Sequence, residues 1–375
     1  MDRKKVIAFY LPQYHTIPEN DASYGKGFTE WTNVKKASPL FKNHNQPRVP
    51  EKNNYYNLLD TEVMIGQAEL AKKYGIYGFC YYHYWFKNGK KLLEKPLEAM
   101  LKDKRVDIPF MLCWANENWT RKWDGGNNEI IVEQDYGDYE DLKKHIDYLC
   151  DFFRDERYIK IDGKPVFVIY KPEIIPNIKK VIGFIRKRVK ENGFSGIVIM
   201  SQYPDYFFAC KKSDLLDYHI QFEPKFIQDY EIERMNLKRR KLKHFMLSHN
   251  MNYLYQILLQ KYQKEKKKEL VHRNYDKDWQ EIINYPVDDK RTVAGAFVDW
   301  DNTPRNRLGL VYDNTTPEKF YYFFKKLVDK VDKEYALDYI FINAWNEWAE
   351  GAYLEPDEKN HYKYLEAVKR VMNND

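Results

Sequence analysis

Eight short apolar or β-branched runs recur along the chain, and amphipathic stretches separate most of them. The runs are residues 6–11, 76–82, 108–114, 165–170, 196–201, 216–222, 293–298 and 338–345. Near-continuously apolar strands that alternate with helices are typical of a parallel sheet covered on both faces. A closed (β/α)8 TIM barrel fits this pattern best, with a doubly wound open sheet as the alternative. No GxGxxG or GxxxxGK[ST] pattern follows any run, so nucleotide-type phosphate binding lacks support.

Helical spacing is clearest in residues 138–155, where the apolar positions share one face. Thr316, Pro317 and Glu318 predict the start of another helix, since they supply a cap residue, a proline in the first turn and an early acid. Further helices are expected at residues 62–74, 90–104, 174–192 and 361–372.

Residues 223–291, between the sixth and seventh runs, exceed a normal barrel crossover. We expect a mostly helical insertion there, within a single catalytic domain that spans residues 1–375. Lysine and arginine concentrate at residues 237–244 and 263–270. Solvated helix faces are the simpler interpretation. Peripheral contact with a membrane, or with an anionic or lipid-linked glycan, is the alternative.

A net charge of +6 over 375 residues is too weak a bias to indicate nucleic acid as a partner. The four cysteines show no CxxC pair and no zinc spacing, which predicts reduced, mostly buried thiols and no metal site. The first apolar run is too short for a signal peptide, and no stretch approaches the roughly 20 apolar residues of a membrane span. We therefore expect a cytoplasmic protein that uses no cofactor.

The active site of such a barrel lies at the carboxyl ends of the strands and in the loops that follow. Here those segments read YLPQYH, GFTEWTN, YYHYWF, CWANENWTRKW, FVDWDNTPR and AWNEWAEG, and they or the loops they open hold eight of the nine tryptophans. Tryptophan beside acidic, amide and basic side chains is typical of a carbohydrate cleft, because indoles stack on sugar C–H faces while polar groups bind hydroxyls. Simple packing of the barrel mouth is the alternative.

Glu347 and Glu350, beside Trp345 and Trp348, are the candidate acid and base. Glycosyl transfer needs one carboxylic acid to protonate the leaving oxygen and a second carboxylate as base or nucleophile. Neighbouring indoles raise a carboxyl pKa by desolvation, and repulsion between two acids favours one protonated and one ionised group. The alternative is a helix amino terminus with acids in its first turn.

The other candidates would bind substrate. Asn116 and Glu117 bind hydroxyls in this interpretation, or satisfy loop backbone groups in the alternative. Asp299 and Asp301 form a D-x-D pattern that holds a metal in some glycosyltransferases, but at a seventh barrel strand we favour a sugar-binding loop with Arg305. The remaining candidates are Tyr10, Gln13, His15, Trp31, His83, Trp85, Trp114, Trp119, Tyr170, Trp300, Trp345, Asn346 and Trp348.

The segment FYLPQYHTIPENDASYGKGFTEWTNVKKASPLFKNHNQPRVP, with WDNTPR and NAWNEWAEG, resembles the WbsX-like proteins of polysaccharide biosynthesis. These are relatives of glycoside hydrolase family 99, the endo-α-mannosidase type. The resemblance spans Ile7 to Glu355 and implies a (β/α)8 barrel with a retaining mechanism. It implies that Glu347 is the base on the sugar 2-hydroxyl, which forms a 1,2-anhydro intermediate, and that Glu350 is the general acid/base. An axial 2-hydroxyl, as in mannose or rhamnose, suits this chemistry.

Three functions stay open. We favour a retaining glycoside hydrolase that cleaves α-mannoside- or rhamnoside-type linkages in a surface polysaccharide. The second is a glycosyltransferase or transglycosylase in O-antigen, lipopolysaccharide or capsule biosynthesis. The third is a non-catalytic glycan-binding module.

Overall fold

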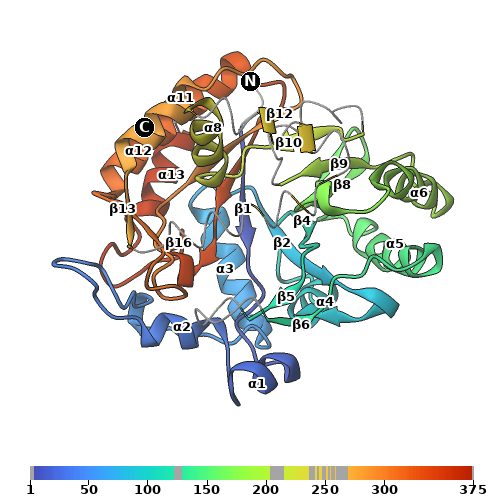
Figure 1. Ribbon diagram of the computed structural model, residues 1–375, viewed down its shortest axis with the longest axis horizontal. Helices are drawn as coiled ribbons and strands as arrows, with labels where there is room; N and C mark the ends of the chain where they lie inside the picture. Colours follow the sequence, from blue (N-terminus) through green and yellow to red (C-terminus); the bar gives the residue numbers. More distant parts are fainter. Residues whose placement is uncertain are drawn as a thin grey trace.

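The computed structural model describes residues 4–121, 129–202, 215–235, 241–242, 245–246, 251, 254, 258 and 269–373. Within these residues, eight parallel strands form the barrel. They are β1 (Lys5–Tyr10), β2 (Gly78–Trp85), β4 (Phe110–Trp114), β8 (Lys164–Ile169), β9 (Val198–Ser201), β10 (Tyr218–Ile220), β12 (Thr292–Phe297) and β14 (Tyr339–Asn343). Since β1 pairs with both β2 and β14, the sheet closes on itself (Figure 1). The predicted (β/α)8 barrel is confirmed, and each of the eight predicted runs overlaps one barrel strand.

Strand side chains alternate between the barrel interior and the shell of helices. Phe9 of β1 meets Phe222, beyond the non-adjacent strand β10, at 5.3 Å between ring centroids, so Phe9 points inward. The next side chain, Tyr10, points outward and donates a hydrogen bond of 2.5 Å to Gln67 of α3 (Thr61–Lys73). The parity of each strand-end residue therefore decides whether it faces the mouth or a helix.

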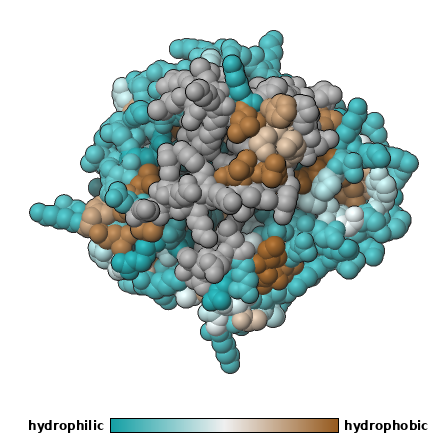
Figure 2. All heavy atoms as spheres, viewed as in Figure 1, coloured by the Kyte–Doolittle hydropathy of each residue, from teal (hydrophilic) through white to brown (hydrophobic). Residues whose placement is uncertain are grey.

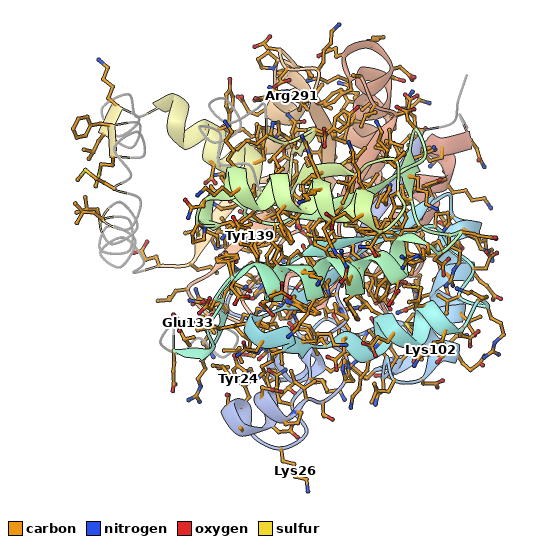
Figure 3. All side chains as sticks on the ribbon, turned by 90° about the vertical axis from the view of Figure 1, so that its right-hand side faces the viewer. Tyr24, Lys26, Lys102, Glu133, Tyr139 and Arg291 are labelled. Atoms are coloured by element: carbon orange, nitrogen blue, oxygen red, sulfur yellow. The ribbon has the colours of Figure 1, made fainter. Side chains whose placement is uncertain are left out.

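Helices surround the barrel, and Figure 3 shows it from the side, with Glu133 and Tyr139 at one end and Lys102 at the other. Besides α3 they are α1 (Pro18–Tyr24), α2 (Glu30–Lys36), α4 (Glu94–Lys102), α5 (Tyr139–Phe153), α6 (Ile178–Glu191), α8 (Lys225–Met235), α11 (Tyr275–Asn284), α12 (Pro317–Glu334) and α13 (Lys363–Asn373). The predicted start of α12 is confirmed: Thr316 is the cap residue and its hydroxyl accepts from the Lys319 amide at 3.3 Å.

Two helices begin later than the sequence predicts. The residues before α4 form β3 (Lys91–Leu92), which pairs antiparallel with the end of β2. The residues before α6 include a short 3-10 turn, Pro172–Ile174. In both cases a short local element precedes the helix, and the apolar spacing does not reveal it.

The predicted insertion is described only in part. Its helical parts are α8 and α11, and α11 packs on the barrel through Trp279, which stacks with Phe297 of β12 at 5.4 Å. Between them β11 (Val271–Asn274) pairs in parallel with β13 (Leu310–Asp313). Most of both basic runs lies outside the described residues, so the insertion and the single-domain boundary stay predictions.

Three of the four cysteines, Cys80, Cys113 and Cys150, are free and buried, as predicted, and Cys210 lies outside the described residues. No helix in the described part of the chain is both long and apolar enough to span a bilayer. Among the residues that Figure 2 colours by hydropathy, most on this face are hydrophilic, with separate hydrophobic areas.

Candidate active site

The segment after β14 folds into a tight hairpin at the barrel mouth. β15 (Asn346–Glu347) pairs antiparallel with β16 (Ala352–Tyr353), and a 3-10 turn, Trp348–Glu350, connects them. Gly351 closes the turn at a φ of +64°, and a Cβ there would lie 2.9 Å from the guanidinium of Arg48 and from the Asp301 amide nitrogen. Only glycine fits this close approach. The carboxylates thus stand on a hairpin turn, not on the amino-terminal turn of an α-helix.

Arg305, from the loop after β12, binds three carboxylates, and we call this group the Arg305 cluster. Its Nη2 lies 2.5 Å from Glu347 Oε1 and 2.6 Å from Glu30 Oε1. Its Nη1 lies 2.5 Å from Glu350 Oε1. Because one guanidinium holds both Glu347 and Glu350, the two carboxylates share one small volume of the mouth. Three segments that are distant in the sequence supply the members of this cluster: the start of α2, the loop after β12 and the hairpin.

Glu30, the first residue of α2, was missed by the sequence analysis. It lies within the GFTEWTN segment that was noted for its tryptophan, but an acid in the first turn of a helix is usually explained by the helix dipole. The structure instead buries Glu30 completely, and its Oε2 has no hydrogen-bond partner among the described residues.

Electrostatics in the cluster oppose full ionisation, because three carboxylates face one cation. Burial raises the pKa of Glu347 to about 8; Arg305 lowers it, while Glu350 and Glu30 raise it further. Burial also raises the pKa of Glu350, against the opposing charge of Arg305. The cluster therefore retains a proton at neutral pH. The Glu350 side chain is 24% exposed and that of Glu347 9%, so Glu350 is the more accessible of the two.

Gln13, Tyr84 and Trp119 form a wall beside the cluster. Gln13 Nε2 donates to the Tyr84 hydroxyl at 2.8 Å, and its backbone carbonyl accepts from the Glu30 amide at 3.3 Å. Trp119 meets the Tyr84 ring edge-on at 5.0 Å. Gln13 Oε1 is buried and has no hydrogen-bond partner in the described structure. Gln13 thus contacts Glu30 of the cluster directly, whereas Trp119 packs on Tyr84 and hydrogen-bonds Asn20 at 3.1 Å.

Asn116, Glu117 and Tyr170 lie on a second side of the mouth. Asn116 Nδ2 donates to the Lys171 carbonyl at 2.8 Å and Asn116 Oδ1 accepts from the Lys171 amide at 2.8 Å, so its amide satisfies loop backbone. Glu117 pairs with the Lys171 ammonium at 2.5 Å. Burial raises the pKa of Tyr170, and the charges of Glu117 and Glu350 raise it further, which places this phenol near the catalytic candidates.

His83, Trp85 and Trp114 are brought together elsewhere, against α5. His83 Nε2 lies 2.9 Å from His145 Nε2, and the Trp85 ring stacks on His145 at 4.7 Å. Trp114 meets His145 edge-on, also at 4.7 Å. Burial lowers the pKa of His83 to about 3, so this group is neutral. Like Tyr10, which lies against α3, these side chains point outward from the barrel.

Trp31, Trp345, Asn346 and Trp348 form buried support behind the hairpin. Asn346 Oδ1 accepts from the Leu11 amide at 2.7 Å and its Nδ2 donates to the Leu11 carbonyl at 3.1 Å, which ties the hairpin to the end of β1. Trp31 packs on Trp348 at 5.4 Å, and both, like Trp345, are at most 5% exposed. The indoles therefore exclude water from the hairpin and present little surface to a ligand.

Asp299 and Asp301 anchor the segment 44–48. Asp301 accepts from His44 at 2.9 Å and Gln46 at 2.6 Å, and Asp299 pairs with Arg48 at 2.8 Å. Burial raises the pKa of Asp301, but the His44 hydrogen bond and the Arg48 charge outweigh it and hold the pKa low. The described residues contain no group of three or more His, Cys, Asp or Glu side chains arranged for a metal ion.

The two remaining candidates differ in exposure. Trp300, next to Asp299, is partly buried and packs against the core. His15 is buried, its Nδ1 lies 3.1 Å from the Pro12 carbonyl, and burial lowers its pKa to about 4. Among the described residues, neither side chain forms a hydrogen bond or an ion pair with the Arg305 cluster.

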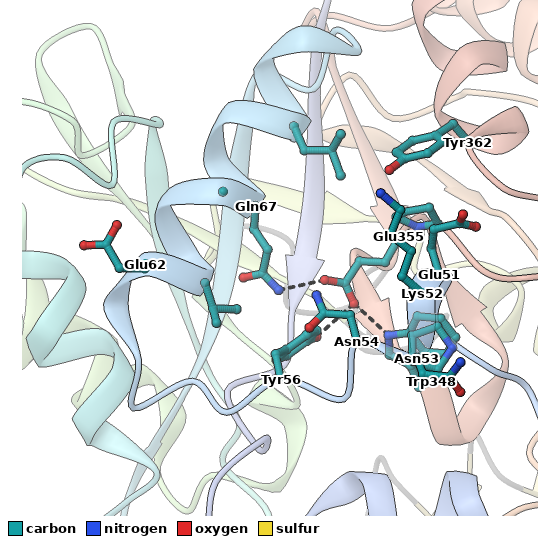
Figure 4. A pocket seen from close by; sticks show the side chains of 15 residues that line it. Glu51, Lys52, Asn53, Asn54, Tyr56, Glu62, Gln67, Trp348, Glu355 and Tyr362 are labelled. Atoms are coloured by element: carbon teal, nitrogen blue, oxygen red, sulfur yellow. Dashed lines mark hydrogen bonds between the residues drawn. The ribbon is translucent and has the colours of Figure 1, made fainter.

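Glu355 is a second buried carboxylate that the sequence analysis did not single out. Tyr56, Gln67 and Trp348 donate hydrogen bonds to it at 2.8, 2.7 and 2.7 Å (Figure 4). Burial raises its pKa to about 7, against these hydrogen bonds. An acid that precedes a proline in a loop gives no sequence signal of burial, and only the hairpin fold turns it inward.

Comparisons with known proteins agree with this architecture. The model of the family described as "Glycosyltransferase WbsX" matches residues 6–368. Curated proteins described as "Uncharacterized protein WxcX", from two strains of Xanthomonas campestris pv. campestris, are each 33% identical to this chain. The match covers 98% of this chain and 49% of theirs, so the chain spans about half the length of these relatives.

Two solved structures share the fold. The chain is similar to the GH99 endo-alpha-mannosidase from Bacteroides thetaiotaomicron, with a TM-score of 0.53, 12% identity and coverage of 98% of this chain and 96% of that one. A structure described as "Glycoside hydrolase-like protein" gives a TM-score of 0.57 at 13% identity, over 99% and 94% of the two chains. At these identities the likeness concerns the fold alone. The chain belongs to the family described as Glycosyltransferase WbsX, and its barrel is similar to that of a family 99 glycoside hydrolase, as the sequence resemblance implies.

Proposed function

We propose that this chain is a carbohydrate-active enzyme that cleaves α-mannoside- or rhamnoside-type linkages with retention, with Glu347 and Glu350 as the catalytic pair. The observation that carries the proposal is the single guanidinium, Arg305, that binds both carboxylates. Membership of a family named for sugar transfer supports it. So does the position of the pair at the carboxyl end of the barrel strands, where enzymes of this fold hold their active sites.

The roles follow from the resemblance to family 99. Glu347, as its carboxylate, takes the proton of the sugar 2-hydroxyl, and the 2-oxygen attacks the anomeric carbon to form the 1,2-anhydro ring. The bond to the leaving oxygen breaks, and that oxygen takes its proton from Glu350. In the second step Glu350 takes a proton from water, the water oxygen opens the ring at the anomeric carbon, and Glu347 returns its proton to the 2-oxygen.

Arg305 fits this cycle because it compensates whichever carboxylate is ionised in each step. The unpartnered, buried Oε1 of Gln13 is an acceptor for a sugar hydroxyl, since a buried polar atom without a partner gains a hydrogen bond when ligand binds. Tyr170 and Glu117 are proposed to contact the sugar from the opposite wall, and Trp119 supports the wall through Tyr84.

Glycosyl or transglycosyl transfer is the second candidate, because the family description names a glycosyltransferase. In the same site, an acceptor hydroxyl would replace water in the second step. We propose a surface polysaccharide, such as O-antigen, lipopolysaccharide or capsule, as the glycan in either case. The basic runs favour an anionic or lipid-linked glycan, a proposal that fails if glycan binding is insensitive to salt between low and moderate concentration.

The test is a panel of α-mannan and rhamnan oligosaccharides, incubated with the protein and followed by NMR for product size and anomer. Hydrolysis with retention gives shorter products that appear first as the α anomer. Products longer than the substrate, or turnover only with a nucleotide sugar, would establish transfer instead. Binding without turnover across the panel would leave a glycan-binding module and contradict both catalytic proposals.

A further inference from the structure

A cavity of about 610 Å³ lies beside the hairpin, and we call it the side cavity. Its lining comes from residues 50–54, Tyr56, α3, the Glu355–Pro356 segment and Tyr362 (Figure 4). Trp348 also lines it, and this residue follows Glu347 in the chain. None of the four members of the Arg305 cluster is among the described residues that line the cavity. The side cavity is therefore separate from the candidate active site, and Trp348 and Tyr56 connect the two within the described residues.

Glu355 forms the polar floor of the side cavity. The residue is 8% exposed and Figure 4 shows it at the centre of the lining side chains. Its donors in the described structure are a phenol, an amide and an indole, all neutral. The Trp345 indole also acts on Glu355 as a donor that lowers its pKa, so we expect a ligand hydroxyl to replace one of these donors or to share an oxygen with it.

The wall formed by residues 50–54 is held in place. The Glu51 amide donates to the Pro356 carbonyl at 3.0 Å, and the Lys52 amide donates to Glu358 at 2.7 Å. Lys52 and Asn53 have φ values of +57° and +55°, a conformation that side chains other than glycine rarely adopt. Such backbone is retained where the surroundings determine it, and it is enriched at ligand sites.

We propose that the side cavity is a second sugar-binding site, which takes a hydroxyl-rich pyranose residue through Glu355, the Asn54 amide and the aromatic rings of Tyr56 and Tyr362. Carboxylate, amide and aromatic groups are the combination that recognises sugar hydroxyls and C–H faces. Phosphate and other anions do not fit, because the lining contains three glutamates and one lysine. The inference rests on the proposed function only in the choice of mannose- and rhamnose-type sugars as probes.

Two exposed helical glycines provide a matched test. Gly66 of α3 lines the side cavity, whereas Gly183 of α6 does not. At either position an added Cβ would meet no atom within 4 Å. Gly66→Leu therefore adds bulk to the cavity lining from a position where the Cβ is accommodated, while Gly183→Leu makes the same change elsewhere. Both variants are expected to melt no lower than the wild type, since leucine favours a helix more than glycine does.

The readout is the indole N–H resonance of Trp348, assigned with Trp348→Phe, because this group donates to Glu355. Methyl α-mannopyranoside and methyl α-rhamnopyranoside are titrated into the full chain. We expect a saturable shift in the wild type, in Gly183→Leu and in Glu350→Gln, and at least tenfold weaker binding in Gly66→Leu and in Asn54→Ala.

Four results would overturn the inference. One is a Trp348 resonance that neither glycoside moves. Another is an equal shift in Gly66→Leu, and the third is a shift that putrescine causes and the glycosides do not, which assigns the cavity to an amine. Loss of the shift in Glu350→Gln alone would place the probe in the active site and also overturn it. The readout is binding at Trp348 and does not depend on turnover. If the protein cleaves no glycoside but its Trp348 resonance still shifts, the proposed function is contradicted and the second sugar-binding site is supported.

Discussion

Two buried glutamates, Glu347 on the hairpin and Glu355 just after it, show how partners decide what a carboxylate can do. Burial raises the pKa of both, to about 8 and about 7. Glu347 shares the cation Arg305 with two other carboxylates, so a proton gained by one changes the charge that the others experience. Glu355 instead accepts hydrogen bonds from three neutral side chains. We therefore expect a proton to pass between carboxylates in the Arg305 cluster and not at Glu355.

The largest expected effect is on turnover. Glu350→Gln removes the proposed acid while it keeps the shape of the side chain, and it should lower kcat/KM by roughly 10²–10⁴-fold, the usual contribution of a general acid or base. Steady-state rates on the oligosaccharide that the wild type cleaves best provide the measurement. Glu140→Gln, on the exposed first turn of α5, is the matched control and should leave the rate unchanged. A loss below about tenfold for Glu350→Gln contradicts the role.

Removal of the shared cation should destabilise the protein. Arg305→Met leaves three carboxylates without a counter-charge, and loss of one partner of a buried pair costs about 3 kcal/mol. The loss should grow as pH rises from 5 to 8, because the three acids are progressively forced to ionise together. Urea unfolding of the variant and the wild type at several pH values measures this. A loss that is small and constant with pH would mean that Arg305 does not compensate the cluster.

The pH dependence of activity distinguishes the roles of the two acids. If Glu347 is the base, kcat/KM should rise by about tenfold per pH unit until the pH reaches about 8, where Glu347 loses its proton. Glu355 lies outside the cluster, so Glu355→Gln should leave this rising limb in place. A rate that is highest below pH 7 and falls through pH 8 would reverse the roles, with Glu347 as the acid.

The smallest effect concerns stability at Glu355. Its pKa is raised on folding, so its stabilising contribution is complete below the unfolded value near 4.3 and is lost as pH rises through about 7. Between pH 5 and 7 this one proton contributes a slope of up to about 1.4 kcal/mol per pH unit to the free energy of unfolding. Glu355→Gln should remove that slope. An unchanged slope would show that Glu355 ionises as easily when folded as when unfolded.

The barrel could be predicted from the sequence because each apolar run and each helical stripe reports its own local burial. Glu347, Glu350 and Arg305 could be singled out as candidates from the sequence because each follows a predicted barrel strand. The sequence did not predict which strand side chains point into the barrel and which point toward the helices. His83 and Trp114 end strands as clearly as any candidate, but one-residue alternation turns them toward α5, and the sequence does not fix that register.

Long-range partners were also beyond the sequence. Glu30 and Arg305 are 275 positions apart, and nothing local marks them as a pair. The same holds for Asp301 and His44, whose hydrogen bond fixes a distant loop. The D-x-D pattern was visible, but its oxygens are occupied by His44, Gln46 and Arg48, which only the folded arrangement reveals.

The central claim is that Glu347 and Glu350 act as one catalytic unit on Arg305, and a double-mutant cycle in kcat/KM tests it most directly. Wild type, Glu347→Gln, Glu350→Gln and the double variant are compared on one oligosaccharide. Residues that act together give non-additive losses. The account predicts that each single variant loses at least about 100-fold and that the double variant is no slower than the slower single one. Losses that multiply in the double variant, or single losses below about tenfold, would contradict it.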